Sequence, residues 1–217
     1  MIILITGGGG PTGQAVARRF RQDGHTVIAV DRTASDENGV IAVDLLDRAA
    51  VQRLAQQIEA EHGRLDGLVH LVGGWRGSKS FAETDLADWD FLHDLLIRTL
   101  QHVTLAFEPL LRKSGNGRFA IVSAKAAERP TAGGACYAAA KAAAEAWTLS
   151  LADALKDTGG AATVLVVKAL VNDQMKAAKP DAAFPGYTHV DDLAAAVAGL
   201  FDRPAGQING TRLDLTQ

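Results

Sequence analysis

The chain has 217 residues, which is enough for one domain with a full hydrophobic core. Its 47% hydrophobic and 22% charged residues are ordinary proportions for a globular protein. The formal net charge of −3 excludes the basic surface of a nucleic-acid-binding protein. The single cysteine, Cys136, excludes both a disulfide framework and a cysteine-based zinc site.

Short apolar runs alternate with helical patterns along the chain. The strands that we expect cover residues 2–5, 26–30, 40–43, 67–72, 118–123, 163–167 and 211–215. A first helix follows the glycine-rich segment and ends at Gly24, and further helices are expected over residues 47–62, 88–112, 134–156 and 189–201. Strands that alternate with helices require crossover connections, so the pattern predicts an α/β fold in which helices cover both faces of a parallel sheet.

The pattern indicates one domain over residues 1–217, because Gly159-Gly160 and residues 204–206 are typical of turns within a domain. Residues 170–187 are the least patterned part of the chain, and we expect them to form a flexible surface loop that acts as a short lid. The opening apolar run, residues 1–5, is far too short for a signal peptide or a membrane span. We therefore expect a cytoplasmic protein with no membrane partner.

A glycine-rich segment lies between the first expected strand and the first expected helix. Gly8-x-Gly10-x-x-Gly13 and Gly7-x-x-Gly10-x-x-Gly13 both fit a dinucleotide-binding fingerprint in the context that such a motif requires. Glycines let the backbone approach a pyrophosphate, and the helix that follows presents free N–H groups to this anion. Thr12 can add its N–H and its hydroxyl. The alternative is a plain glycine-rich turn between a strand and a helix.

An acidic residue, Asp31, ends the second expected strand, eighteen residues after Gly13. This spacing is close to that of a ribose-binding carboxylate, which would repel the 2′-phosphate of NADP. Arg32 has the opposite effect, because a guanidinium could bind this phosphate. We expect NAD as the cofactor, with NADP as the less favoured alternative. Asp44-Leu45, after the third expected strand, is placed to contact the adenine, although Asp44 could simply end the strand.

Tyr137 and Lys141 are four residues apart near the start of the expected helix 134–156, so they share one helical face. A phenol ordinarily titrates near pH 10, and an ammonium close to it favours the phenolate and lowers this pKa. The pair therefore predicts a general acid/base that works near neutral pH.

At these positions the chain resembles the short-chain dehydrogenase/reductase family. The resemblance covers essentially the whole sequence and includes His70-Leu71-Val72-Gly73, where the family usually has Asn-Asn-Ala-Gly. It implies a Rossmann-like, doubly wound parallel sheet of about seven strands and chemistry on carbonyls and alcohols linked to NAD(P). By this resemblance Tyr137 protonates the carbonyl oxygen, and Lys141 lowers the pKa of Tyr137 and binds the nicotinamide ribose. The cofactor-binding residues that we expect are Gly7, Gly10, Thr12, Gly13, Asp31, Arg32, Asp44, Leu45, Val72, Gly73 and Lys141.

The chain departs from the family at two positions near the expected site. The family usually places a serine thirteen residues before the tyrosine, where this chain has Ala124. Ser123 is the candidate catalytic replacement, although strand alternation turns successive side chains to opposite faces and so directs Ser123 away from the reacting oxygen. Leu96 stands where the family has a helical asparagine that supports a proton relay. Loss of one donor to a developing oxyanion can cost roughly 10²–10³ in rate.

The sequence thus predicts an NAD(H)-dependent oxidoreductase that acts on a small carbonyl or alcohol substrate. Two alternatives remain open. The segments Gly73-Gly74-Trp75 and 123–127 resemble those of dihydropteridine reductase, which also lacks the serine, so a quinonoid dihydropterin is a second candidate substrate. The other alternative is a catalytically weak NAD(P)-binding regulatory protein. Family resemblance also implies a homodimer or homotetramer built on the helices 88–112 and 134–156. The six histidines show no metal-ligand spacing, so we expect no metal.

Overall fold

The computed structural model describes residues 1–216 and contains a seven-stranded parallel sheet in the order β3-β2-β1-β4-β5-β6-β9. The strands of this sheet are β1 (Ile2–Thr6), β2 (Thr26–Asp31), β3 (Val40–Ala42), β4 (Gly67–His70), β5 (Arg118–Ala124), β6 (Ala161–Val167) and β9 (Arg212–Asp214). The order reverses beside β1, where β2 leaves on one side and β4 on the other. The predicted α/β fold with a parallel sheet of about seven strands is therefore confirmed.

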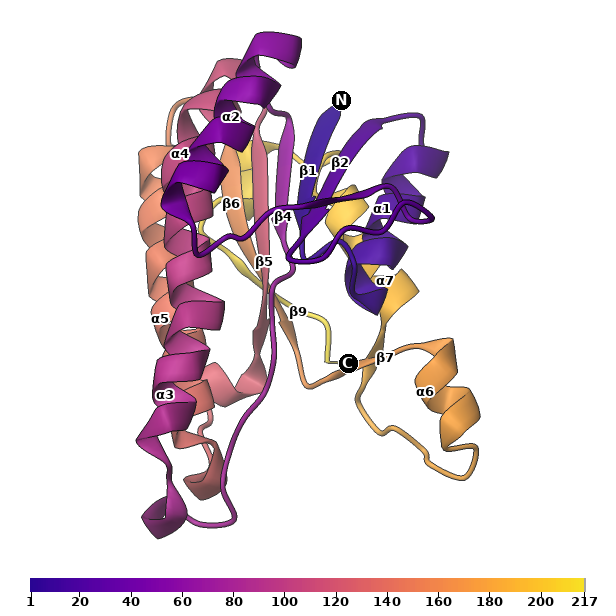
Figure 1. Ribbon diagram of the computed structural model, residues 1–217, viewed down its shortest axis with the longest axis vertical. Coiled ribbons are helices and arrows are strands. Elements are labelled where there is room, and N and C mark those ends of the chain that lie inside the picture. Colours follow the sequence, from indigo (N-terminus) through magenta and orange to yellow (C-terminus); the bar gives the residue numbers. More distant parts are fainter. Residues whose placement is uncertain (217) are drawn as a thin grey trace.

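Helices cover both faces of the sheet (Figure 1). One layer contains α2 (Arg48–His62), α3 (Leu86–His93), α4 (Thr99–Ser114) and α5 (Ala135–Ala154), and the other contains α1 (Pro11–Gln22) and α7 (Val190–Gly199). The short α8 (Ala205–Ile208) precedes β9. Each layer has its own apolar core against the sheet: Phe107 and Phe119 lie on the α4 side, and Phe20 and Leu193 on the α1 side. The central strands are apolar on both faces because both faces are buried.

The helix expected over residues 88–112 is longer and is interrupted. α3 passes into a π-helical turn, Asp94–Arg98, which continues directly into α4. Thr99 Oγ1 donates to Leu95 O at 2.7 Å within this stretch, and Leu96 lies inside the turn, buried against Leu92 and Ala140. A π turn shifts the helical register by one residue, which an apolar periodicity does not reveal.

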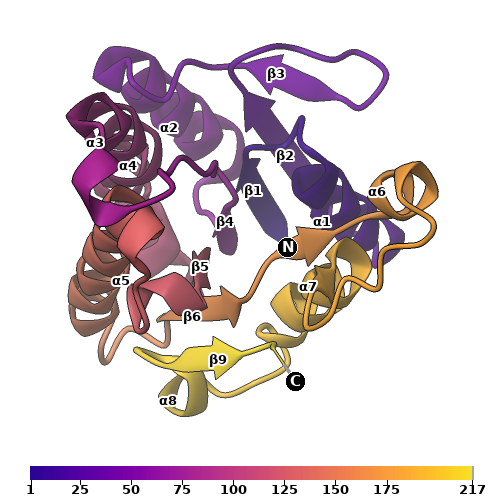
Figure 2. The ribbon, with the colours of Figure 1, turned by 90° about the horizontal axis from the view of Figure 1, so that it is seen from below.

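Residues 170–187 were expected to form an unpatterned loop, and that expectation is wrong for the first part of the segment. β7 (Leu170–Val171) pairs in parallel with β8 (Thr188–His189), and α6 (Asp173–Ala178) lies between these two strands in the sequence. Asn172 caps α6 by accepting a hydrogen bond from Met175 N at 2.8 Å. The segment lies at the end of the molecule beside α1 and α7 (Figure 2).

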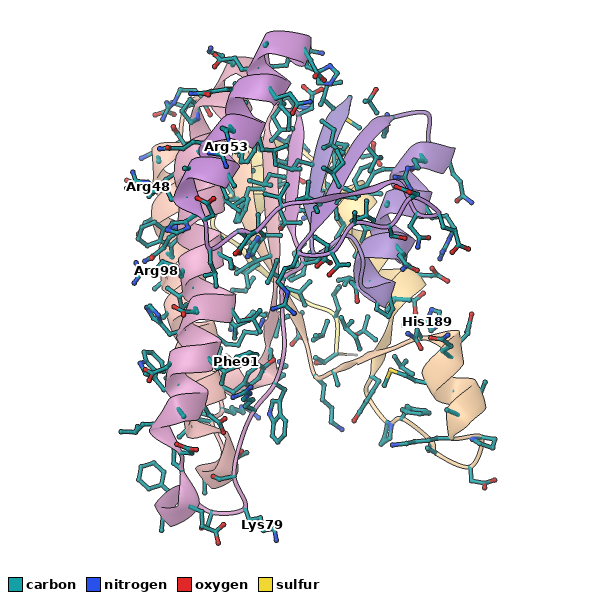
Figure 3. The ribbon with its side chains drawn as sticks, viewed as in Figure 1. Arg48, Arg53, Lys79, Phe91, Arg98 and His189 are labelled. Carbon is teal, nitrogen blue, oxygen red and sulfur yellow. The ribbon has the colours of Figure 1, made fainter. Side chains whose placement is uncertain are left out.

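The lid segment is joined to α7 through His189, which lies between them in Figure 3. His189 Nε2 is 3.2 Å from Asp173 Oδ1 on α6, and its Nδ1 is 3.6 Å from Asp191 Oδ2 on α7. A role of this segment as a lid stays a prediction.

Candidate functional site

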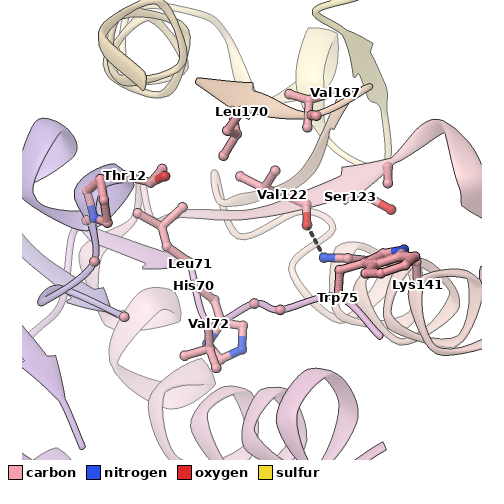
Figure 4. Close-up of a pocket in the computed structure, with 18 of the residues that line it drawn as sticks. Thr12, His70, Leu71, Val72, Trp75, Val122, Ser123, Lys141, Val167 and Leu170 are labelled. Atoms are coloured by element: carbon pink, nitrogen blue, oxygen red, sulfur yellow. Dashed lines mark hydrogen bonds between the residues drawn. The ribbon is translucent and has the colours of Figure 1, made fainter. Parts of the chain in front are cut away.

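A cavity of about 400 Å³ opens where the carboxyl ends of β1, β4, β5 and β6 meet (Figure 4). This is the edge at which open parallel sheets bind their ligands, next to the point where the strand order reverses. Among the predicted site residues, those that line this cavity are Gly7, Gly10, Thr12, Gly13, Val72, Gly73, Ser123, Tyr137 and Lys141. Residues separated by up to 134 positions in the sequence thus meet at one site.

The turn between β1 and α1 needs glycine at two positions for steric reasons. Gly7 has φ +77°, and a Cβ there would lie 2.8 Å from the carbonyl carbon of Leu71. A Cβ on Gly13 would lie 2.2 Å from Gly7 O. The N-cap of α1 is Gly10, which has no side chain to cap the helix, and Pro11 has no N–H. The amides of the first turn of α1 therefore remain available to an anion, as a pyrophosphate site requires.

The Asp31 carboxylate lies against this turn. Its Oδ2 accepts a hydrogen bond from Gly9 N at 2.9 Å, and its Oδ1 accepts one from Arg32 N at 2.7 Å. The Arg32 side chain is exposed beside it. Both residues stand outside the lining of the cavity but at the edge of the glycine turn, where the adenosine half of a dinucleotide would extend.

Asp44 and Leu45 take two different environments. Asp44 is exposed and accepts a hydrogen bond from Leu46 N at 2.9 Å. The Leu45 side chain is only 6% exposed and packs in the core, while Leu45 O lies 3.0 Å from His102 Nδ1. The side chain of Leu45 therefore points away from the cofactor site, and only its backbone could contact an adenine.

Tyr137 and Lys141 occupy successive turns of α5 and face the cavity. Lys141 is 8% exposed, and its Nζ donates to Val122 O at 2.8 Å (Figure 4). The same atom lies 5.8 Å from the centre of the Tyr137 ring. Burial lowers the pKa of Lys141 to about 8, although the negative charge of Glu145 opposes this shift. An ammonium that loses its proton near pH 8 is poised for proton exchange with a neighbouring group.

The pKa of Tyr137 does not follow the expectation. Burial raises the pKa of this phenol above its ordinary value, whereas the sequence predicted that Lys141 would lower it. The physical reason is burial: the Tyr137 ring lies largely out of water, where the phenolate is poorly solvated. The positive charge of an oxidised nicotinamide would act in the direction that the sequence analysis expected.

Ser123 is buried at the end of β5 and donates to Glu145 Oε1 at 2.5 Å. Strand alternation predicted that this hydroxyl would be turned away from the reacting oxygen. Ser123 lines the same cavity as Tyr137 and Lys141, so its direction relative to that oxygen stays a prediction. Ala124, the next residue, also lines the cavity. A catalytic role for Ser123 stays a prediction.

Two further features shape the site. The first is His70, for which the sequence predicted a place near the cofactor, with a structural histidine as the favoured alternative to a hydrogen bond with the cofactor. His70 is buried between Thr6 Oγ1, 2.7 Å from its Nδ1, and Thr99 Oγ1, 3.4 Å from its Nε2. Burial, together with the charge of Lys141, lowers the pKa of His70 to about 3, so this imidazole is neutral. The second feature is Glu145, whose Oε2 is 2.8 Å from Arg212 Nε. The spacing of four residues from Lys141 to Glu145 is the one signal that the sequence offered for it.

Within residues 1–216 no group of three or more His, Cys, Asp or Glu side chains is arranged to hold a metal ion. In the same part of the chain, none of the helices combines the length and the apolar character that crossing a membrane requires.

Comparisons with known proteins agree with this geometry. A sequence model of the short chain dehydrogenase family matches residues 1–182. The chain is 30% identical over 168 residues to the NADP-dependent 3-hydroxy acid dehydrogenases YdfG of Shigella flexneri and of Escherichia coli (strain K12), and the match covers 73% of this chain and 68% of each relative.

Solved structures share the fold over nearly the whole chain. A short chain dehydrogenase from Shigella flexneri in complex with NADP superposes with a TM-score of 0.85 at 23% identity, covering 100% of this chain and 97% of that one. A 3-ketoacyl-(acyl-carrier-protein) reductase from Brucella melitensis in complex with NADH superposes with a TM-score of 0.82 at 24% identity, covering 98% and 95%.

Proposed function

The chain belongs to the short-chain dehydrogenase/reductase family, and from that premise we propose that it is an oxidoreductase in which Tyr137 moves a proton to or from the oxygen of a small carbonyl or alcohol substrate. The observation that carries the proposal is the convergence of Tyr137, Lys141 and the glycine turn on one cavity. A residue pair alone is weak support, because a Tyr and a Lys at helical spacing occur often by chance. Their meeting with an anion-binding turn at the carboxyl edge of the sheet makes the combination specific.

The residues present fit a nicotinamide dinucleotide. Gly7 and Gly13 form a tight turn that a Cβ at either position would block, and the first turn of α1 has uncapped amides for a pyrophosphate. In this proposal Lys141 donates to a ribose hydroxyl at the nicotinamide end, and Asp31 accepts from one at the adenosine end. When bound, the nicotinamide supplies or accepts the hydride.

We propose NAD as the preferred cofactor because of the Asp31 charge, which opposes a 2′-phosphate. The relatives favour NADP instead, since YdfG is described as NADP-dependent and the Shigella flexneri structure contains NADP. The exposed Arg32 is the group on this chain that would favour NADP. The substrate class of the relatives, 3-hydroxy acids, makes a 3-oxo acid a natural member of a substrate panel.

A quinonoid dihydropterin remains the second candidate substrate. Ala124 lines the cavity where a hydroxyl would assist an ordinary ketone, and Trp75, with 66% of its surface exposed, lies at the rim, where its ring could stack on a flat substrate. An already reactive electrophile needs less activation by a donor.

The test is steady-state oxidation of NADH and NADPH with a small ketone, a 3-oxo acid and quinonoid dihydropterin, in the natural chain and in Tyr137→Phe. We expect Tyr137→Phe to lose about 10²–10⁴-fold in kcat, because the proton donor to oxygen is removed. Tyr187→Phe is the matched control, since Tyr187 is the only other tyrosine and is 38% exposed on the lid segment, outside the cavity lining.

Each result assigns a different function. Full activity in Tyr137→Phe would mean that the substrate takes its proton elsewhere. Tight binding of NADH without turnover of any of the three substrates would favour a regulatory protein that retains the cofactor site.

A further inference from the structure

The buried ammonium of Lys141 has an incomplete environment. Its Nζ has three donors and gives one hydrogen bond to protein, to Val122 O. Charged side chains as buried as this one are costly unless a countercharge is near them. The groups that line the same cavity supply none: Tyr137 on α5 and His70 on β4 are neutral, and Lys168 after β6 is a second cation. Among residues 1–216, no aspartate or glutamate lines this cavity.

A carboxylate lies directly behind the cavity wall. Glu145 follows Lys141 by one turn of α5, and 12% of its side chain is exposed. Its Oε1 accepts the hydroxyl of Ser123 from β5, and its Oε2 meets Arg212 Nε from β9 at 2.8 Å. Three elements therefore hold this carboxylate in one position.

The bonds of Lys141 and Glu145 show how the two groups are placed. Lys141 binds the carbonyl of Val122, and Glu145 binds the side chain of Ser123, which is the next residue of the same strand. An ammonium and a carboxylate on adjacent turns of one helix thus bond to adjacent residues of β5, just where that strand opens into the cavity. Arg212 lies on the outer side of Glu145, where its side chain is 35% exposed.

We propose that Glu145 is a positioning residue for the Tyr137–Lys141 pair: held between Ser123 and Arg212, its carboxylate sets a negative charge one helical turn from the Lys141 ammonium and fixes α5 to the end of β5. The inference rests on the proposed function for the catalytic importance of Lys141. The interaction between Glu145 and Lys141 does not depend on that function. The charge of Glu145 raises the pKa of Lys141, against the larger lowering by burial. Arg212 moderates this effect because it neutralises part of the same carboxylate.

Two substitutions should shift the pKa of Lys141 in opposite directions. Glu145→Gln removes the negative charge, so the pKa of Lys141 should fall by about one unit from its value of about 8. Arg212→Gln leaves Glu145 without its guanidinium partner, so the pKa of Lys141 should rise. A purely structural role for Glu145 would not produce shifts of opposite sign.

The measurement is a ¹³C NMR titration of the full-length protein labelled at the lysine ε-carbons, with the Lys141 signal assigned by its loss in Lys141→Met. Glu128→Gln is the matched control, because Glu128 pairs with Arg212 at 3.4 Å but is joined to neither Ser123 nor Lys141. We expect Glu128→Gln, which acts on Lys141 only through Arg212, to shift the pKa of Lys141 much less than Glu145→Gln does. We expect Glu145→Asp to keep the pKa of Lys141 close to its natural value.

An unchanged Lys141 titration in both Glu145→Gln and Arg212→Gln overturns the inference. If Glu145→Gln does not fold, the Lys141 titration in Arg212→Gln, a substitution at a partly exposed position, still tests the inference. The titration needs no substrate, so a failure of the proposed reaction is a separate result. Where the enzyme turns over, the alkaline limb of the rate profile should shift to lower pH in Glu145→Gln.

Discussion

The Asp31 carboxylate has two effects that substitution can separate. As a hydrogen-bond acceptor it holds Gly9 N and so shapes the glycine turn, and as a negative charge it opposes a phosphate at the adenosine end of the cofactor. An asparagine retains an acceptor oxygen and removes the charge. Cofactor choice can therefore be tested without dismantling the turn.

We expect the natural chain to bind NADH more tightly than NADPH, and Asp31→Asn to narrow this gap by about tenfold, which corresponds to about 1.4 kcal/mol. The measurement is calorimetric titration with each cofactor. Asp36→Asn, an exposed acid on the segment after β2, is the control for a general change of charge. A natural chain that prefers NADPH would reverse the assignment and transfer the decisive role to Arg32.

Single residues were predictable from the sequence where their role is local. Gly7 and Gly13 satisfy a steric demand of one turn, and Tyr137 and Lys141 share a helical face by spacing alone. Glu145 and Arg212 were not predictable, because 67 residues separate them and only the pairing of β9 with β6 brings them together. The two threonines that bind His70 likewise come from separate parts of the chain.

At the scale of elements, the turn from β1 into α1 is the most constrained connection of the site. Gly13 lies in the first turn of α1, and a Cβ there would meet Gly7 O at 2.2 Å and Gly8 Cα at 2.6 Å. Both atoms belong to the backbone, so the turn itself must move. Gly10, three residues earlier, has 3.6 Å of space to its nearest neighbour and an ordinary φ of −74°.

Gly13→Ala should therefore destabilise the protein by about 2 kcal/mol, as overpacking against backbone does, and should abolish measurable cofactor binding. Gly10→Ala, the matched control, should cost less than about 1 kcal/mol, the cost of a poorer helix N-cap. Urea unfolding of the cofactor-free proteins measures both. Equal losses in the two variants would show that space at Gly13 is not what the turn requires.

Apolar periodicity predicted the positions of the helices α5 and α7, which pack on the sheet. α5 and α7 begin and end within two residues of the expected bounds, because their buried faces repeat regularly. The helix of the lid segment could not be predicted in this way, because α6 has no buried residue and therefore no apolar stripe. Its helix depends instead on the Asn172 cap, a local signal that Pro180 and Pro185 obscured.

At the scale of the molecule, the parallel sheet followed from the alternation of strands and helices, but the order of its strands did not. The residue pattern of β4 is the same whether β4 lies beside β1 or beside β3, so only the packed structure fixes β1 at the centre. The expected homodimer or homotetramer stays a prediction. Leu105 on α4 and Leu149 on α5, exposed at 58% and 43%, are apolar positions on the helices where that assembly would form.

His70 connects the sheet to the helix layer on one of its faces, because it binds Thr6 on the central strand β1 and Thr99 at the start of α4. Its pKa of about 3 in the folded chain lies far below the 6.5 of an ordinary histidine. The unfolded chain therefore takes up a proton below pH 6.5 that the folded chain refuses until about pH 3. The stability that neutral His70 contributes is complete above pH 6.5 and is lost as the pH falls, by about 1.4 kcal/mol per pH unit.

Urea unfolding of the natural chain should accordingly show a loss of about 2 kcal/mol between pH 6.5 and pH 5 that comes from this one side chain. His70→Gln keeps a polar group between the two threonines but cannot titrate, so its stability curve should be flatter over the same interval even if the variant is less stable throughout. The comparison concerns the slopes of the unfolding free energy against pH. These slopes report protonation of His70, whereas the loss of stability caused by the substitution itself shifts the whole curve. Parallel curves for the two proteins would show that His70 accepts a proton in the folded state, and that the contact between β1 and α4 does not depend on its neutrality.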